Sequence, residues 1–496
     1  MAQYRSRPCS LDDSFEYIEC AATKGSNSSP TTPDRTNSRT PPLTQEQFSK
    51  LLDAEGRLVD EHALRQAVFL GGVDPSIRKE VWQFLFGLYP CTSTGREREV
   101  LRLDNYVKYR ELKSRWKTML VVQSKPGASP LEQGLVAKYQ QEVDEDLPSP
   151  DKLSYEDPGD RDPEGNSSTA SPAQLVPALF TAQKNKTDLS ESNLPFDITS
   201  PDVQQRMEFM KLQSQVYVNR QQLDMDQLRT DIRIIDKDVP RTDRDYEYFL
   251  GKNNPHLTQL REALITFAAF QTDIGYAQGM NDIMARFLVV FNSEVEAYWC
   301  FTKYMISVKN DFDEEGMVQK IDLVRKLLEQ FDNSLISHLE SHDLGDLLFC
   351  HRWLLLGFKR EFNFDDSLRC FEILSSHHLE LSSLEAANAR RREQMKEFEN
   401  QDGVLRTVDN LTLHYDYTFE SFMCVALLIQ CREGLLKCTD SAMVFQCING
   451  LQIDLDDVLG KAESLFFQYC KRTVGDCFVL VDVPKSDHSK RRGAKH

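Results

Sequence analysis

Apolar residues recur every three or four positions along most of the chain, which is the spacing of helices that bury one face. A clear stripe is formed by Ile77, Val81 and Leu85, with Asp74 expected as the N-cap and Pro75 at the first helical position. No run of alternating β-branched residues is long enough to predict a sheet. We therefore predict an all-α fold with helical segments at residues 44–52, 60–70, 74–90, 101–120, from 203 onward, 257–271, 293–308, 317–331, 333–342, 346–362, 387–400 and within 419–469.

Local signals place the ends of some of these helices. Thr44 and Gln47 form the pattern of a capping box, in which two side chains satisfy free backbone N–H groups of the first turn. Glycine suits the position after a helix, so the second segment is expected to stop at Gly71 and Gly72. The charged segment at 387–400 is expected to be an exposed helix.

Composition divides the chain into one helical domain and three polar segments. Residues 1–43 are predicted to be a disordered tail that could hold a short linear motif, and residues 476–496 a polar, basic tail. The multi-helix domain at 44–475 is interrupted by a predicted disordered insert at about 123–200. Residues 142–164 of this insert hold ten acidic against two basic side chains, so the insert is expected to be a solvated linker rather than core.

Net charge and apolar content exclude several classes of function. A net charge of −18 with a pI near 5.1 argues against general nucleic-acid binding and against adsorption to anionic lipid. The N-terminus lacks the apolar core of a signal peptide, and the longest strongly apolar run, at 422–429, is too short for a transmembrane segment. The expected location is the cytoplasm.

Cysteine spacing gives no support for a metal site. The twelve cysteines include no C-x-x-C pair, and no histidines follow at the spacing of zinc ligands. This pattern predicts buried free thiols in a reducing compartment and no bound metal.

Two segments have residues suited to chemistry, whereas P-loop, G-x-S-x-G, H-E-x-x-H and kinase motifs are absent. The first, at 234–249, is highly charged and the second, at 275–282, reads GYAQGMND. Each combines a proline or glycine with one long polar side chain, Arg241 in the first and Gln278 in the second. Hydrolysis of GTP needs positive charge at the γ-phosphoryl oxygens and a group that orients the attacking water, which an arginine and a glutamine would supply.

These segments resemble the paired signature of the TBC domain, the GTPase-activating domain that acts on Rab proteins. The family's first motif, I-x-x-D-V-x-R-T, is matched by Ile235, Asp238, Val239, Arg241 and Thr242. Its second motif, Y-x-Q-G-M, is matched by Tyr276, Gln278, Gly279 and Met280. The likeness covers about residues 45–470, and the insert and the charged segment near residue 390 depart from the family in length only.

The resemblance implies that Arg241 and Gln278 enter the active site of a GTP-loaded Rab protein in trans. The family likeness gives supporting roles to the neighbouring motif residues, which are Asp238, Thr242, Tyr276 and Gly279. GTP and Mg²⁺ would belong to the partner, so the chain would be an enzyme activator with no cofactor of its own. Two plainer interpretations remain: Arg241 could be a solvated surface residue, and Gln278 could cap a helix.

An arginine–tryptophan helix typical of the family is matched by Arg78 and Trp82, which makes both candidates for partner binding. Packing is the favoured role for Trp82, as it is for Trp353 and Phe362 in a later similar segment. Arg78 could bind the partner or pair with a carboxylate.

A second, weaker signal lies in the N-terminal tail. Phe15 and Ile18 fit an aromatic-x-x-aliphatic pattern behind Asp12 and Asp13. This pattern resembles the short motif that binds ubiquitin-like autophagy modifiers by adding a strand to a sheet edge. The alternative is a short apolar patch that folds back on the domain.

Three functions follow from these patterns. The first is activation of a Rab GTPase, with peripheral recruitment to vesicle or autophagosomal membranes. The others are a Rab-binding scaffold without catalysis and an autophagy adaptor whose helical domain only binds.

Overall fold

The computed structural model describes the greater part of the chain from Arg39 onward, and these residues belong to one unit, Arg39–His496. The residues before Arg39 lie outside the description. The described ranges are 39–123, 133–134, 136–140, 200–251, 253–399, 405–407, 417–449, 453–475 and 478–480.

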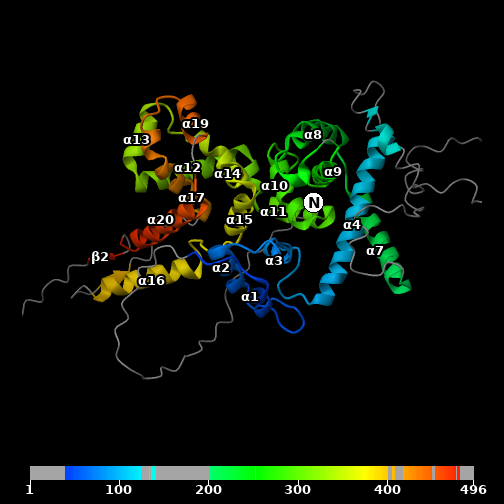
Figure 1. Cartoon of the computed structure of the whole chain (residues 1–496), viewed down its shortest axis with the longest axis horizontal. Helices are drawn as coiled ribbons and strands as arrows, with labels where there is room; N and C mark the ends of the chain where they lie inside the picture. The colour runs from blue at the N-terminus through cyan, green and yellow to red at the C-terminus, as the bar shows by residue number, and fades with distance from the viewer. Residues whose placement is uncertain are drawn as a thin grey trace, which may run out of the picture. The chain divides into compact units, whose positions relative to one another are not determined.

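The all-α prediction is confirmed (Figure 1). The α-helices are α1 (Gln45–Lys50), α2 (Glu61–Gly71), α3 (Arg78–Leu85), α4 (Gly95–Val122), α7 (Pro201–Arg220), α8 (Met225–Asp238), α9 (Pro255–Phe270), α10 (Met280–Phe291), α11 (Glu294–Ser307), α12 (Glu314–Phe331), α13 (Asn333–Ser341), α14 (His351–Leu356), α15 (Phe364–Ser375), α16 (Leu384–Glu399), α17 (Phe419–Gln430), α18 (Arg432–Leu435), α19 (Ser441–Asn449) and α20 (Leu455–Gly475). Short 3-10 helices are η3 (Val239–Arg241), η4 (Glu247–Phe249), η5 (Lys309–Phe312), η6 (Leu348–Cys350) and η7 (Lys359–Glu361). The described strands are β1 (Leu405–Thr407) and β2 (Phe478–Leu480), which pair antiparallel with Leu405 opposite Leu480.

The helices bury two hydrophobic cores. The first includes α3 and the neighbouring helices α9, α10 and α11, and Trp82 packs in it against Phe86, Phe287 and Phe371. The second is built mainly by α12, α14, α17 and α20. Helix α15 contributes to both cores, because Phe371 belongs to the first and Cys370 to the second. These rigid cores form the support from which the charged loops project.

Several predicted helix ends are confirmed, and one is not. The Thr44–Gln47 capping box is present, and α2 ends at Gly71 with Gly72 at a φ of 74°. Helix α3, however, begins only at Arg78, because the carboxylate of Asp74 accepts a hydrogen bond from the backbone N–H of Ser76 and forms a turn instead of an N-cap.

Two predicted boundaries differ from the structure. Leu43, assigned to the tail, is buried and its N–H donates to the carbonyl of Gly72. Tyr139, assigned to the insert, is fully buried against Trp116. The remaining residues of the predicted tails and insert lie outside the described residues, apart from Arg39, Thr40 and a few short pieces.

The charged helix near residue 390 is less exposed than expected. Helix α16 packs along α20, and Ala386 and Ala389 are buried between them. The two alanines are three positions apart, so they lie on one face of α16, and their small side chains let the two helices approach closely. In the sequence they are followed by many charged residues, which is why an exposed helix was expected.

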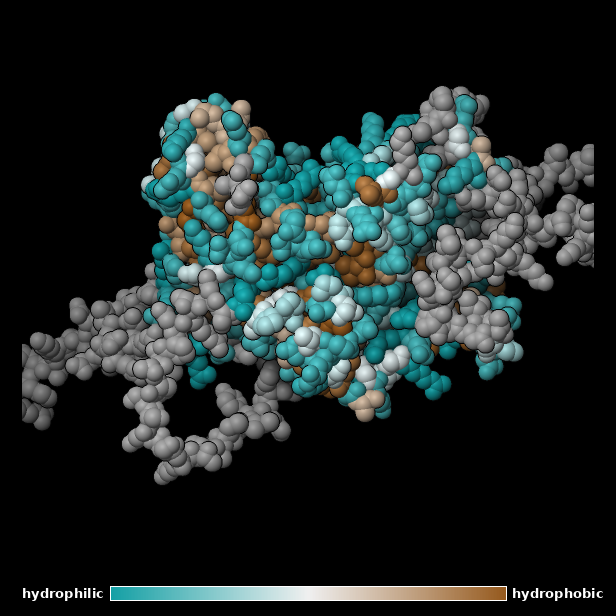
Figure 2. Space-filling model, viewed as in Figure 1, coloured by the Kyte–Doolittle hydropathy of each residue, from teal (hydrophilic) through white to brown (hydrophobic). Residues whose placement is uncertain are grey.

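The surface of the described region is largely polar. Figure 2 shows hydrophilic side chains over most of the visible face, with hydrophobic ones gathered in smaller patches. The described cysteines are all free thiols, as predicted, and most of them are buried. Among the described residues, no helix combines the length and apolar content that a bilayer span requires.

Candidate functional site

Arg241 lies at the end of a helix that stops at a proline. Helix α8 runs through the first part of the charged segment, and the buried Ile235 and Val239 anchor its end in the first core. Pro240 lacks a backbone N–H and cannot continue the helix regularly, so the chain tightens into η3. Arg241 follows at once, with 57% of its side chain exposed.

Gln278 lies on the loop between α9 and α10. Gly279, which precedes α10, has a φ of 106°, and a Cβ there would lie 3.0 Å from a methyl of Leu356. Both constraints require glycine at this position. In the described part of the chain the exposed Gln278 amide makes no hydrogen bond, and α10 has no side-chain cap. The interpretation of Gln278 as a helix cap is therefore wrong.

A buried hydrogen-bond network connects the two segments. Asp238 is almost fully buried; its Oδ1 accepts from Nη2 of Arg241 at 2.5 Å and its Oδ2 accepts from the hydroxyl of Tyr276 at 2.9 Å. Burial and the Asp238 carboxylate raise the pKa of Tyr276, so the hydroxyl remains a donor. The Nδ2 of Asn281 donates to Oγ1 of Thr242 at 2.9 Å, which joins the segments a second time.

Arg241 and Gln278 share one polar cleft of about 390 Å³. The cleft is lined by Arg241, Asp243, Arg244, Asp245, Gln278, Asn281, Asp282 and Arg360.

Two of the acidic side chains of this cleft, Asp243 and Asp282, are held by a buried lysine. Nζ of Lys359 bonds to Oδ2 of Asp243 at 2.5 Å and to Oδ1 of Asp282 at 3.2 Å, and Nη2 of Arg360 bonds to the other oxygen of Asp282 at 2.9 Å. Burial alone would raise the pKa of Asp282, but the two cations lower it, so the carboxylate is ionised. Arg360 stays 58% exposed. The cleft therefore presents two exposed guanidinium groups, those of Arg241 and Arg360.

Sequence reasoning paired Arg241 with Gln278 but missed the residues that hold their loops. Asn281 stands just after the second motif, and Lys359 and Arg360 lie in the segment GFKREF, which was noted only for its apolar residues. Their part in the site depends on contacts between segments distant in sequence, for which a single sequence has no signal.

Trp82 has the packing role favoured for it rather than the partner-binding one, and Arg78 takes the alternative role. Trp82 is fully buried, and its Nε1 donates to Oε2 of Glu372 at 2.8 Å. Arg78 donates from Nε to the same oxygen at 2.9 Å and from Nη2 to the carbonyl of Val73 at 3.0 Å. A side chain inside the core cannot contact a partner, and the pairing of Arg78 with a carboxylate is confirmed.

Two of the remaining residues singled out from the sequence pack in a core, and two lie outside the described residues. Trp353 is fully buried in the second core and Phe362 packs partly buried against it, as expected for packing residues. Phe15 and Ile18 lie outside the described residues.

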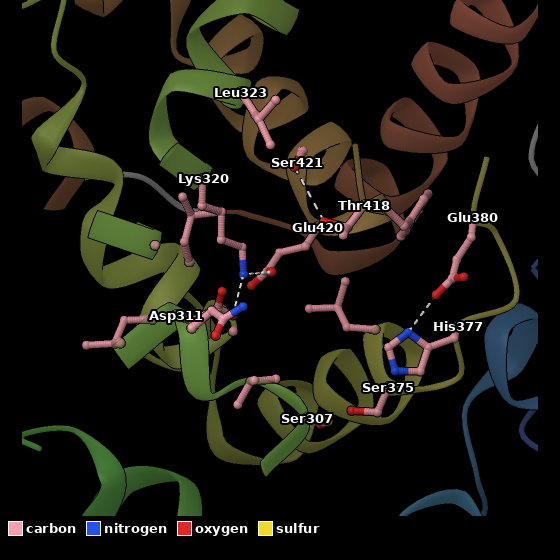
Figure 3. A pocket seen from close by; sticks show the side chains of 18 of the residues that line it. Ser307, Asp311, Lys320, Leu323, Ser375, His377, Glu380, Thr418, Glu420 and Ser421 are labelled. Atoms are coloured by element: carbon pink, nitrogen blue, oxygen red, sulfur yellow. Dashed lines mark hydrogen bonds and ion pairs between the residues drawn. The ribbon is translucent and has the colours of Figure 1, made fainter. Parts of the chain in front are cut away.

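A larger cleft of about 800 Å³ lies between η5, α12, α15 and the start of α17 (Figure 3). Nζ of Lys320 bonds there to Asp311 at 2.7 Å and to Glu420 at 2.5 Å. Burial alone would lower the pKa of Lys320, but these two carboxylates raise it. Because the three charges already satisfy one another, we interpret this cluster as structural.

We predict that Tyr276→Phe lowers the free energy of unfolding by about 1.5–3 kcal/mol, since it removes a hydrogen bond to a buried charge. Urea denaturation measures the loss. Tyr248→Phe is the matched control, because the Tyr248 hydroxyl bonds to the neutral Oδ1 of Asn292 at an exposed site; its loss should be about 1 kcal/mol or less. Equal losses would contradict the role given to Asp238.

Comparison with known proteins agrees with the motifs. Residues 184–394 match the family model of the Rab-GTPase-TBC domain. The human protein TBC1 domain family member 17 is 27% identical over 362 residues, which cover 73% of this chain and 40% of the relative. GTPase-activating protein gyp7 of Schizosaccharomyces pombe is 27% identical over 357 residues, which cover 69% of this chain and 35% of the relative. The crystal structure of the Ypt/Rab-GAP domain of Gyp1p aligns with a TM-score of 0.46 and 14% identity, over 86% of this chain and 98% of that chain.

The part of this chain that matches the model of the Rab-GTPase-TBC domain contains both motifs, which lie on one cleft of an all-helical fold. The chain spans less than half the length of the two curated relatives described above.

Proposed function

We propose that this chain stimulates GTP hydrolysis by a Rab-family small GTPase, as an activator that supplies catalytic side chains in trans. The observation that carries the proposal is the placement of exposed Arg241 and Gln278 on one cleft, Arg241 just after α8 and Gln278 on the loop before α10, two helices that pack in the first core. The names of the relatives, among them a GTPase-activating protein, support the same function.

The two side chains would act on different parts of the reaction. The Arg241 guanidinium would meet negative charge that develops on the γ-phosphoryl oxygens, and the Gln278 amide would orient the attacking water. Asp238 holds the Arg241 side chain in the free protein. Less side-chain conformational entropy would therefore be lost when the partner docks. GTP and Mg²⁺ would come with the partner.

The test is a panel of purified GTP-loaded Rab proteins, with hydrolysis measured with and without the chain. We expect acceleration of one or a few of them, and a loss of about 10²-fold or more in that acceleration for Gln278→Ala. Gln319→Ala is the control, because this glutamine is exposed on α12 and lines the other cleft. No acceleration of any Rab would overturn the proposal.

The same panel separates the alternatives. Binding to a GTP-loaded Rab without acceleration would indicate a scaffold. Alanine at Phe15 and Ile18 should leave hydrolysis unchanged; loss of binding to a ubiquitin-like modifier in this variant would identify a separate adaptor role. A Rab on a membrane would also recruit the chain peripherally.

A further inference from the structure

Three metal-binding side chains meet on the side of the domain where α2 and α16 begin. His62 is near the start of α2, His378 follows α15, and Glu385 is near the start of α16. Oε1 of Glu385 lies 3.1 Å from Nε2 of His62 and 3.8 Å from Nε2 of His378. One ligand atom from each of the three residues lies within 4.8 Å of the others.

Two atoms of this cluster are buried without a hydrogen bond. They are Nδ1 of His378 and Oε2 of Glu385, which find no partner among the described residues. The His378 side chain is only 4% exposed, and its ring packs against Phe69. Leaving a buried polar atom unsatisfied is unfavourable by about 1–3 kcal/mol, so such atoms call for a functional reason.

The donor set suits a borderline-soft divalent ion. Two imidazole nitrogens and one carboxylate oxygen are preferred ligands of zinc, whereas Mg²⁺ and Ca²⁺ favour oxygen alone. In a tetrahedral zinc site the ligand atoms are about 3.3 Å apart, a spacing that small side-chain rotations would produce here. His62 is 52% exposed, so an ion could enter and keep water as a further ligand.

We propose that His62, His378 and Glu385 bind one divalent transition-metal ion of the zinc class and thereby fasten the start of α16 to α2. Helix α16 is otherwise held chiefly through its packing on α20. His62 is distant in sequence from His378 and Glu385, which is why cysteine and histidine spacing gave no sign of the site. The role is structural and independent of the cleft that holds Arg241.

The experiment titrates the full chain with Zn²⁺ by calorimetry after treatment with a chelator. We expect saturable binding of one equivalent and a higher melting temperature, because a ligand of the folded state stabilises it. His62→Ala should weaken binding by about tenfold or more, and Glu385→Ala likewise. Mg²⁺ should produce neither effect.

His377→Ala is the matched control. His377 is adjacent to His378 but is 64% exposed and pairs with Glu380, as Figure 3 shows. This variant should bind Zn²⁺ as the wild type does. A Co²⁺ spectrum without sulfur charge-transfer bands would place the ion on nitrogen and oxygen rather than on a cysteine. No saturable binding by the wild type, or unchanged binding in His62→Ala and Glu385→Ala, would overturn the proposal, and neither result depends on GTP hydrolysis.

Discussion

Replacing Arg241 with lysine is expected to reduce the acceleration of Rab GTP hydrolysis by about 10³-fold or more. Lysine keeps the charge, but its ammonium is a point charge on a flexible stem. The guanidinium offers a planar fork, with Nη2 already bonded to Asp238 and the remaining N–H groups free to point toward the phosphate. A cation that is already in position lowers the barrier because it stabilises negative charge that develops only in the transition state.

Single-turnover hydrolysis by the accelerated Rab provides the measurement, with binding to the GTP-loaded form measured in parallel. Arg96→Lys is the control, because Arg96 is exposed on α4 and lies outside the cleft. We expect binding of the Arg241 variant to weaken far less than catalysis. If Arg241→Lys retained full acceleration, Arg241 would be an ordinary surface residue and the proposed mechanism would fail.

Replacing Glu372 with alanine should have the largest effect on folding, a loss of about 3–5 kcal/mol in the free energy of unfolding. The Glu372 side chain is fully buried and accepts four hydrogen bonds, one from the N–H of Val73, two from Arg78 and one from Trp82. Its removal would leave the Arg78 guanidinium, only 12% exposed, without its counter-charge. Burial raises the pKa of Glu372, and the Arg78 guanidinium, which favours the charged carboxylate, offsets this only in part.

Urea denaturation tests this prediction with two further variants. Glu372→Gln keeps the shape and an acceptor oxygen, so a smaller loss is expected. Glu46→Ala removes an exposed ion pair with Lys50 and should change stability by about 1 kcal/mol or less. A loss for Glu372→Ala no greater than for Glu46→Ala would contradict the buried-pair interpretation.

The sequence by itself determined the helical class, several helix ends and the two side chains proposed for catalysis. These features depend on neighbours a few positions away: the Thr44 capping box, the glycines after α2, and the motifs around Arg241 and Gln278. Local hydrogen bonding is also why the start of α3 was misplaced, since Asp74 can cap a helix or close a turn and the sequence does not distinguish the two.

Only the tertiary structure decided how distant segments meet. It brings Asn281 to Thr242, Lys359 to Asp282, Glu372 to Trp82, and His62 to Glu385. It also shows which residues surround Trp82, whose packing role was already favoured from the sequence. Hydrophobic periodicity identifies which face of a helix is buried but not which other helix covers it, because apolar packing is non-directional. The polar pairs that join the helices are therefore visible only once the two cores are assembled.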